Sequence, residues 1–344
     1  MLNASIVVPI RNASRTLPHC LAALACLDPA PGEIILVDNG STDESLSLIQ
    51  RFAHDHFSKR VQILAEQRRG AATARNTGAR AAGGDVIAFT DSDCAPDPAW
   101  LGHLLAPLAD PKVCAVAGRV VSAPPASTVE LFSALYTLQS SEKPARYRRW
   151  TPWAGGFPTA NFGIRRESFQ ELGGFDEEVQ IYGEDYDLCA RLYEGGAEIA
   201  YAPDANVFHH HRVTLSSMLR QAFGFGRSHP YLLSRHALTG VWLELPGYAL
   251  SWDRFPLRAW LDLAAADKKV MAILILGAAY GPAILLLPLY LAWLTILTRQ
   301  RAKGAGTPVC PPRAIGLAGL LLLKSASMTC GRWWGSLKYR ACCF

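Results

Sequence analysis

The chain has 344 residues, half of them hydrophobic, and a net charge of +5. This length allows one large domain or two smaller ones with ample core. The charge is unevenly spread, because ten of the 34 basic residues and none of the 29 acidic residues lie in 268–344, which leaves residues 1–267 with a net charge of −5. Apolar blocks separate the basic residues of this tail, which excludes a nucleic-acid-binding arm and indicates a soluble domain attached to a membrane. Nine scattered cysteines without C-x-x-C spacing favour reduced cytosolic thiols over disulfides or a zinc site.

Strands and helices are expected to alternate through the first hundred residues. Three helices are predicted in this part of the chain. The first begins near residue 17 with Ser14 or Thr16 as its N-cap, the second begins at a capping box formed by Ser41 and Glu44, and the third covers residues 71–82. Short runs of apolar residues predict buried strands at 5–9, 34–37, 61–64 and 86–90. This alternation is typical of a doubly wound α/β fold, in which helices flank a mostly parallel sheet.

The next hundred residues are less regular. Helices are predicted over 166–172 and 185–194, and a helix or interfacial segment over 127–139. Further strands are expected at 113–121, 159–164 and 199–202.

A long apolar segment dominates the C-terminal region. Residues 270–298 carry no charge, and about 20 apolar residues suffice to span a bilayer. Pro282 and Pro288 predict a kink or a re-entrant shape. The shorter apolar run 314–330 contains Lys324 and is either a second span or an interfacial helix. A simple hairpin of two spans conflicts with the positive-inside rule, because the basic residues between the runs would lie outside.

Three tryptophans precede this segment. Trp242, Trp252 and Trp260 flank the basic residues Arg254 and Arg258. They are either interfacial residues leading into the membrane or ordinary core residues.

Two aspartates follow the predicted strand 86–90, in the sequence Asp91-Ser92-Asp93. Ligands of open α/β sheets bind beyond the carboxyl ends of the strands. Two carboxylates there can hold a divalent cation and, through it, the phosphates of a nucleotide. The alternative is a solvated turn, where Asp and Ser are common.

Two other side chains are expected near the same edge. Asp38 ends the second strand and can accept a hydrogen bond from a base or a ribose hydroxyl, unless it only forms an Asx turn. Arg75 lies in the basic segment 68–76 and can make a forked contact to phosphate, unless this helix face is merely solvated.

Carboxylates and histidines complete the candidate residues. Asp185 or Glu184 can deprotonate an acceptor hydroxyl, or simply cap the helix that they begin. Asp176 and Glu177 can bind acceptor hydroxyls. In His209-His210-His211, strand alternation predicts His209 and His211 on one side, where one of them can complete the metal site or contact phosphate.

These features, in this order, resemble family 2 glycosyltransferases of the GT-A fold. The resemblance runs over residues 5–228 and rests on SIVVPI (5–10), VDNGSTD (37–43), GAATARN (70–76), DSD (91–93), GGFDE (173–177) and GED (183–185). It implies a GT-A-type, Rossmann-like sheet, a nucleotide-sugar donor, Mg²⁺ or Mn²⁺, and inversion at the anomeric carbon.

The resemblance also assigns roles to residues. It implies that Asp38 contacts the base with Pro9 nearby, and that Arg75 lies near the diphosphate. Asp91, with Ser92 beside it, would lie on the ribose or sugar side of the donor. Asp93 would bind the metal, and Asp185 would be the catalytic base.

The chain departs from the family pattern at two points. Asn39 stands where many members have a second aspartate, which leaves the base contact to Asp38. No Gln-x-x-Arg-Trp motif follows the predicted base. Processive polysaccharide synthases carry that motif, so its absence and the small membrane part predict non-processive transfer.

The sequence thus predicts a GT-A catalytic domain at 1–230, with a donor half at about 1–120 and an acceptor half at about 121–230. An interfacial linker at 231–269 and a membrane-associated region at 270–344 would follow it. The predicted activity is metal-dependent, inverting hexosyl transfer from a nucleotide sugar, specifically a UDP-sugar, to a saccharide or lipid-linked acceptor. We expect it in cell-envelope or exopolysaccharide assembly, at the inner membrane with the catalytic domain facing the cytoplasm.

Two other classes of protein compete with this interpretation. A non-catalytic membrane scaffold with the same fold could bind saccharide or a partner enzyme, but it would not need the four carboxylates Asp91, Asp93, Glu184 and Asp185. A nucleotidyltransferase would need a glycine-rich, lysine-bearing phosphate loop after the first strand, and residues 11–14 are not one.

Overall fold

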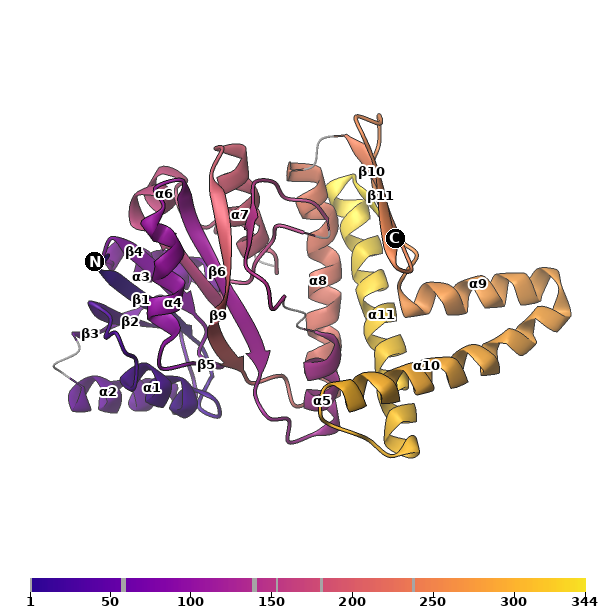
Figure 1. Cartoon of the computed structure of the whole chain (residues 1–344), viewed down its shortest axis with the longest axis horizontal. Coiled ribbons are helices and arrows are strands. Elements are labelled where there is room, and N and C mark those ends of the chain that lie inside the picture. Colours follow the sequence, from indigo (N-terminus) through magenta and orange to yellow (C-terminus); the bar gives the residue numbers. More distant parts are fainter. Residues whose placement is uncertain (1, 57–59, 138–140, 153, 180–181, 237–238) are drawn as a thin grey trace. The chain divides into compact units, whose positions relative to one another are not determined.

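A computed structural model describes residues 2–56, 60–137, 141–152, 154–179, 182–236 and 239–344. The chain forms two compact units (Figure 1). The first comprises Met1–Pro124 and Gln139–His210, and the second comprises Pro125–Leu138 and His211–Phe344. The domain boundaries predicted from the sequence stay a prediction.

A nine-stranded sheet forms the centre of the first unit. Its first half is parallel and alternates with helices, as the sequence predicts. The helices are α1 (Leu17–Ala25), α2 (Ser45–Asp55) and α3 (Ala71–Ala81). The strands are β1 (Ala4–Ile10), β2 (Glu33–Asp38), β3 (Val61–Ala65) and β4 (Val86–Thr90). All five residues of β4 are buried, which fits a strand covered on both faces.

The second half of the sheet mixes directions. The strand order is β3-β2-β1-β4-β8-β6-β9-β5, with β7 also paired to β9. Strand β8 is antiparallel to β4 and β6, β6 is parallel to β9, and β5 and β7 are antiparallel to β9. These strands are β5 (Cys94–Pro96), β6 (Val113–Ser122), β7 (Ala145–Tyr147), β8 (Asn161–Arg165) and β9 (Glu198–His209). The mostly parallel α/β sheet is thereby confirmed.

The other helices of the first unit complete its layers. They are α4 (Trp100–Leu105), a 3-10 turn η2 (Ala106–Ala109), α6 (Arg166–Glu171) and α7 (Glu184–Glu194). Residues of β1, β2, β4, β6, β8 and β9 form one apolar core with side chains of α3 and α7.

Helix α3 lies unusually close to the sheet. A side chain on Gly78 would come within 2.4 Å of Val7 Cγ1 and 3.0 Å of Val37 Cγ2. The absence of a side chain at this position therefore brings the helix against β1 and β2, and the buried polar residues Arg75 and Asn76 come with it.

The start of α2 differs from the prediction. The helix begins at Ser45 without a side-chain cap, downstream of the predicted box. Ser41 instead donates its backbone N–H to the Asp38 carboxylate at 3.3 Å. Asp43 accepts the backbone N–H of Ser45 at 3.0 Å. The capping box of Ser41 and Glu44 is wrong because an Asx turn at Asp38 delays the start of the helix.

Strand β9 is longer than the predicted strand 199–202. It pairs with β6 on both sides of a register shift between Gly118 and Arg119. Because this irregularity realigns the two strands, β9 passes Pro203 and ends only at His209.

The second unit combines helices with a small sheet. Its four-stranded sheet has the order β11-β10-β12-β13. Its helices are α5 (Thr128–Tyr136), α8 (Leu215–His236), α9 (Ala266–Ala279), a 3-10 turn η3 (Gly281–Leu285), α10 (Leu286–Gly304) and α11 (Pro311–Tyr339). Its strands are β10 (Gly240–Leu245), β11 (Tyr248–Asp253), β12 (Arg258–Asp262) and β13 (Cys342–Cys343). The predicted end of the first of these helices, at residue 139, lies outside the described residues.

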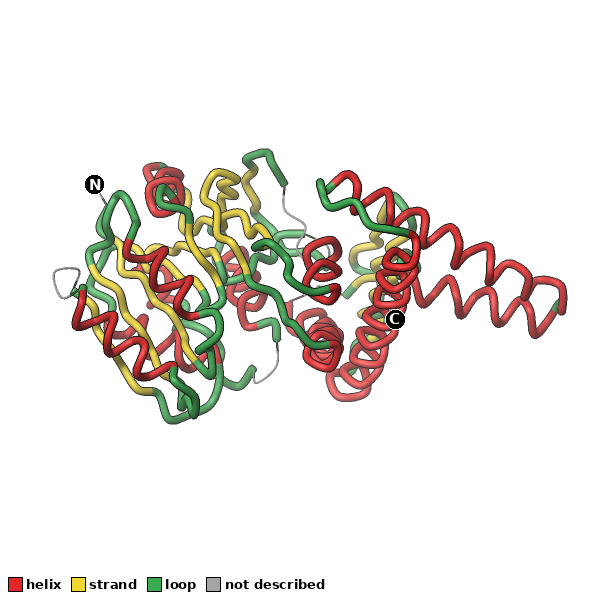
Figure 2. The backbone as a smooth tube through the Cα atoms, turned by 90° about the horizontal axis from the view of Figure 1, so that it is seen from below, coloured by secondary structure: helices red, strands yellow, loops and turns green. Residues whose placement is uncertain are grey.

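The apolar segment 270–298 is divided between two helices. Figure 2 shows α9 and α10 joined by a short turn at their far ends. Two helices, Gly281–Gly304 and Pro311–Tyr339, are long and apolar enough to cross a membrane. Of the three tryptophans, Trp242 and Trp260 are buried in the core, whereas Trp252 is exposed.

Asn161 gives a direct test of this sheet. Its Oδ1 accepts a hydrogen bond from Trp100 Nε1 at 2.7 Å, and its Nδ2 donates to the carbonyls of Arg119 (2.9 Å) and Ala205 (2.7 Å). We expect Asn161→Ala to cost about 3 kcal/mol, because it leaves buried polar groups unpaired. A melting experiment on the purified protein should show a fall in Tm of several degrees.

The matched control is Asn206→Ala, because among the described residues the side-chain amide of Asn206 makes one hydrogen bond, an exposed one to the Asp204 carbonyl. We expect its Tm to stay within about 1 °C of the parent protein. Equal losses in the two variants would contradict a special role for the buried amide.

Candidate active site

Asp38 lies at the carboxyl end of β2, as predicted. It is buried, and its carboxylate accepts the Ser41 N–H described above. The Asx turn that was the alternative interpretation is therefore present. A carboxylate has about four acceptor positions, so this turn leaves room for a ligand contact. Pro9, the other predicted base contact, pairs with Val37 at the adjacent end of β1.

Asn39 has a structural role that the sequence did not reveal. Its Nδ2 donates to the carbonyls of Glu66 (2.9 Å) and Arg68 (2.8 Å). Its Oδ1 accepts the backbone N–H of Gly70 at 3.0 Å. An aspartate has no N–H to donate to two carbonyls, which explains why an amide stands at this position.

Arg75 forms the central ion pairs of the site. Its side chain is only 5% exposed. Its Nη2 lies 2.7 Å from Asp91 Oδ1, and its Nη1 lies 2.8 Å from Glu184 Oε1. These contacts join α3, the end of β4 and the start of α7, and the two carboxylates raise the pKa of Arg75. Arg75, which the sequence predicts to bind phosphate, is thus bound by two carboxylates in this structure.

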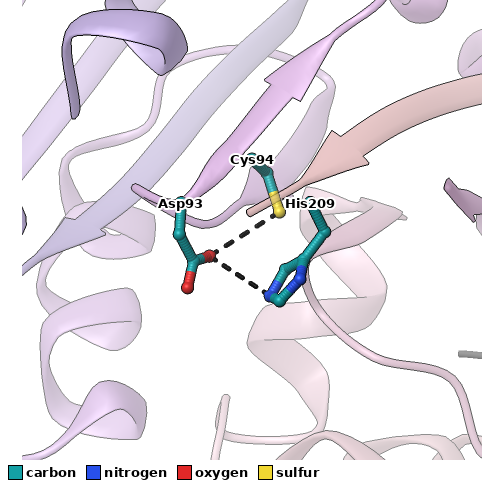
Figure 3. A group of neighbouring side chains, drawn as sticks. All are labelled: Asp93, Cys94 and His209. Atoms are coloured by element: carbon teal, nitrogen blue, oxygen red, sulfur yellow. Dashed lines mark hydrogen bonds and ion pairs between the residues drawn. The ribbon is translucent and has the colours of Figure 1, made fainter. Parts of the chain in front are cut away.

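The two aspartates of Asp91-Ser92-Asp93 point to different partners. Asp91 contacts Arg75, whereas Asp93 Oδ1 lies 3.6 Å from His209 Nε2 (Figure 3). Ser92 is half-buried between them. The predicted division of labour between the two carboxylates is compatible with these different directions.

Cys94 completes a cluster that the sequence analysis missed. Its ligand atom and those of Asp93 and His209 all lie within 4.8 Å of one another (Figure 3). The cause is sheet pairing, because Cys94 and His209 are directly opposite each other in β5 and β9. Burial and the nearby Asp93 and Asp91 carboxylates raise the pKa of the Cys94 thiol.

The other two histidines are arranged differently from the prediction. Strand β9 ends at His209, so the expected alternation does not extend to His211 and that argument is wrong. His210 donates its backbone N–H to the Asp93 carbonyl at 2.8 Å and stacks on His19 with ring centroids 4.7 Å apart. His211 belongs to the second unit, and its metal role stays a prediction.

Glu184 and Asp185 begin α7 and differ in their environments. Glu184 is neutralised by Arg75, whereas Asp185 makes no ion pair among the described residues. Burial raises the pKa of Asp185 to about 7, and repulsion from Glu184 adds to the shift. The Arg75 charge and the backbone N–H of Tyr186 oppose it. A carboxyl group with such a pKa is suited to accept a proton near neutral pH.

Asp176 and Glu177 make contacts within the first unit. Glu177 binds Arg68 Nη1 at 2.6 Å and Asn76 Nδ2 at 3.0 Å. Asp176 accepts the backbone N–H of Glu178 at 2.9 Å. Asn76, a residue that the sequence analysis did not single out, also exchanges two hydrogen bonds with the backbone of Phe175. The acceptor role of Asp176 and Glu177 stays a prediction.

Residues 5–173 match the family model described as glycosyl transferase family 2. This part of the chain belongs to that family. A pre-mycofactocin glycosyltransferase of Mycobacterium tuberculosis is 33% identical over 253 residues, which cover 72% of this chain and 51% of that relative. The chain therefore spans about half the length of this curated relative.

Two solved structures share the fold of this family 2 chain. The mannosyltransferase PcManGT from Pyrobaculum calidifontis, in complex with GDP-Man and Mn²⁺, has a TM-score of 0.61 and 22% identity, covering 97% of this chain and 87% of that one. GalNAc-T7 with UDP, GalNAc and Mn²⁺ has a TM-score of 0.51 and 21% identity, covering 68% of this chain and 50% of that one. These likenesses show the GT-A fold.

The cluster at Asp93 has the chemistry of a divalent metal site in this family 2 chain. It offers a carboxylate oxygen, an imidazole nitrogen and a thiol sulfur from β9 and the segment after β4. All three are ligands of transition-metal ions, and the carboxylate also suits Mg²⁺.

The raised pKa of Asp185 predicts a stability effect that does not depend on catalysis. Because the folded-state pKa is about 7 and the ordinary value is 3.8, the ionised side chain destabilises the folded protein progressively from about pH 4 to pH 7. We therefore expect Asp185→Asn to raise Tm relative to the parent protein at pH 8, and by much less at pH 5. Thermal melts across this range measure the difference.

The matched control for these melts is Asp204→Asn, because Asp204 is exposed. We expect the difference in Tm between Asp204→Asn and the parent protein to be the same at every pH of the series. A gain for Asp185→Asn that is constant with pH would contradict the assigned cause.

Proposed function

We propose that this chain transfers a sugar from a nucleotide-sugar donor to an acceptor hydroxyl with inversion at the anomeric carbon. The observation that carries the proposal is the pair of ion pairs made by Arg75. They bring the end of the donor strand β4 next to the start of α7, where Asp185 lies. A displacement reaction requires this juxtaposition of a donor site and a base.

The proposed reaction is a single displacement. The acceptor oxygen forms a bond to the anomeric carbon as the bond to the diphosphate oxygen breaks, and the nucleoside diphosphate leaves. Asp185 accepts the proton of the acceptor hydroxyl, a role for which its raised pKa suits it. Glu184 pairs with Arg75, and its negative charge adds to the effect of burial in raising the pKa of Asp185.

The donor is held by residues at the carboxyl edge of the sheet. Asp38 and Pro9 contact the base, and Asp91 and Ser92 lie on the ribose or sugar side. A divalent ion held by Asp93 and His209, with Cys94 beside them, would neutralise the charge of the leaving diphosphate. Arg75 supports the diphosphate region by fixing Asp91. The bound GDP-Man, UDP and Mn²⁺ of the two solved structures are compatible with a donor of this class, and we favour a UDP-sugar.

The acceptor is a saccharide or a lipid-linked saccharide, with Asp176 and Glu177 on its side of the site. The apolar C-terminal helices support a lipid-linked acceptor and a location at the inner membrane, with the catalytic unit facing the cytoplasm, where nucleotide sugars are made. Residues 221–227 lack the Gln-x-x-Arg-Trp motif, which supports transfer of one or a few sugars in envelope or exopolysaccharide assembly.

The base assignment is tested by Asp185→Asn. We expect sugar transfer to fall by at least about 100-fold, because the amide cannot accept the proton, while donor affinity changes less than about twofold. A panel of UDP- and GDP-sugars, assayed for transfer and hydrolysis with the parent protein, first identifies the donor. Normal turnover in Asp185→Asn would remove this residue from the base role, and a parent protein inactive towards every donor would contradict the enzymatic function.

The metal assignment is tested by calorimetry with the donor that the panel identifies. Nitrogen and sulfur ligands bind transition-metal ions more tightly than they bind Mg²⁺. We therefore expect Mn²⁺ to strengthen the binding of the nucleotide sugar more than Mg²⁺ does. Asp93→Asn should remove at least about tenfold of the metal-dependent affinity. Asp97→Asn, in the next turn of the chain, is the control and should leave it unchanged. Equal donor affinity with and without metal in the parent protein would contradict the metal site.

A further inference from the structure

The helices α9 and α10 form an apolar hairpin in the second unit. They are joined by η3, and residues 270–298 between the basic ends carry no charge (Figure 1). Within the hairpin, Tyr290 Oη donates to the carbonyl of Ala266 at 3.2 Å, which holds the base of α9 against α10. The two helices therefore run back on each other, and the turn at η3 is the tip of the hairpin.

The outer part of this hairpin is apolar on every side. Leu274, Ile275 and Leu276 are consecutive in α9 and all exposed, although successive residues point in directions about 100° apart. At the tip and along α10, Tyr280, Leu285 and Leu289 are each about two-thirds exposed. A helix that docks on a protein buries one apolar face, whereas a helix that is apolar all round is typical of a lipid environment.

The first helix of the hairpin is too short to cross a bilayer. Helix α9 has 14 residues, which corresponds to about 21 Å, whereas the hydrocarbon core is about 30 Å thick. Asp267 and Lys268 at its base are buried and bind Ser325 and Thr329 of α11. The charged base of α9 therefore stays with the body of the second unit.

The second helix returns to that body. Leu294, Thr298 and Ala302 of α10 recur at a spacing of one helical turn and are buried. Thr298 exchanges a hydrogen bond with Tyr136 of α5 at 2.9 Å. The basic end of α10 thus packs within the same unit as the base of α9, and both ends of the hairpin lie at one side of its tip.

Helix α11 has the composition of a span but packs as part of the unit. A side chain on Gly331 would lie 2.2 Å from the carbonyl oxygen of Phe223 in α8, so the two backbones approach closely. Helix α8 carries Arg220, Arg227 and Arg235, which a bilayer core would not accept. Because α11 is packed along α8, α11 could cross the bilayer only together with α8, and the arginines of α8 oppose this.

We propose that residues 270–293 form a re-entrant anchor that enters one leaflet of a lipid bilayer and returns to the side from which it came. Residues 1–269 and residues 299–344 then lie on the same side of the membrane. Arg299, Arg301 and Lys303 are exposed in the last turns of α10, where they can interact with anionic headgroups. This arrangement removes the conflict with the positive-inside rule that two spans create.

Native cysteines give a direct test of this topology in the full chain. Cys26 and Cys310 are both exposed and lie before and after the hairpin. Variants keep one of these two, replace the other exposed cysteines and Cys114 by serine, and retain the buried cysteines. They are treated with a membrane-impermeant maleimide in inside-out and right-side-out vesicles. A third variant carries Leu285→Cys as its only exposed cysteine.

We expect Cys26 and Cys310 to be labelled in the same vesicle orientation, and the cysteine at position 285 in neither until detergent is added. Labelling of Cys310 in the opposite orientation would show that α10 spans the membrane. Labelling at position 285 from the side opposite to Cys26 would show that the whole hairpin crosses. Labelling at 285 in intact vesicles from the same side as Cys26 would place the tip in water. Each of these three results overturns the proposal.

A pair of lysine substitutions tests insertion without cysteine replacement. Leu285→Lys places a charge at the tip, and Leu337→Lys places one on an exposed leucine of α11. In sedimentation with vesicles containing anionic lipid, we expect the tip variant to lose at least about tenfold in membrane affinity and the control to bind like the parent protein. Equal binding of the two variants would contradict insertion of the hairpin. Sugar transfer plays no part in either readout, so a failure of the reaction proposed above is distinguishable from a failure of the anchor.

Discussion

The site depends on one buried cation placed between two carboxylates. A guanidinium as buried as that of Arg75 would strongly destabilise the folded protein without ion-pair partners. Asp91 and Glu184 are its two partners. The same contacts determine which carboxylates remain available. Because Glu184 pairs with Arg75, Asp185 is left as the carboxylate without an ion pair among the described residues. Burial raises the pKa of Asp185, and the negative charge of the adjacent Glu184 adds to this shift. The proposed difference in role between two adjacent acids thus follows from a single arginine.

The position of that arginine depends in turn on how α3 packs. Gly78 lets the helix approach β1 and β2, and Asn76 binds the backbone of Phe175 with both ends of its amide. Phe175 also lies beneath the guanidinium, with its ring centroid 5.8 Å from Arg75 Cζ. The small residues of α3 are therefore more than helix formers. They allow a polar helix face to be buried against the sheet, and this burial fixes the two ion pairs of Arg75.

The sequence was sufficient to predict the parallel half of the sheet and the places of Asp38 and Asp91 at strand ends, because strand runs and their carboxyl ends are local features. It was not sufficient for contacts made by pairing between distant segments. Cys94 faces His209 only because β5 pairs with β9, and nothing near Cys94 in the chain signals this. The alternation argument for His211 failed because the end of β9 is set by its pairing with β6. Likewise, 270–298 is plainly apolar, but the turn that divides it into α9 and α10 follows from tertiary contacts such as that of Tyr290 with Ala266.

The proposed anchor and the proposed reaction constrain each other through solubility. A nucleotide sugar is charged and stays in water, whereas a lipid-linked acceptor keeps its chain in the bilayer and its sugar at the surface. An enzyme that joins them needs its catalytic residues on one side of the membrane and a firm attachment to that surface, but it has no need to cross. A hairpin that enters a single leaflet meets this requirement with a short apolar segment, since both of its charged ends stay in water. Two full spans would instead carry four basic residues to the side of the membrane that lacks the nucleotide sugar, namely Arg299, Arg301, Lys303 and Arg313. Moving these charges across the bilayer has an energetic cost, and the proposed reaction does not require it.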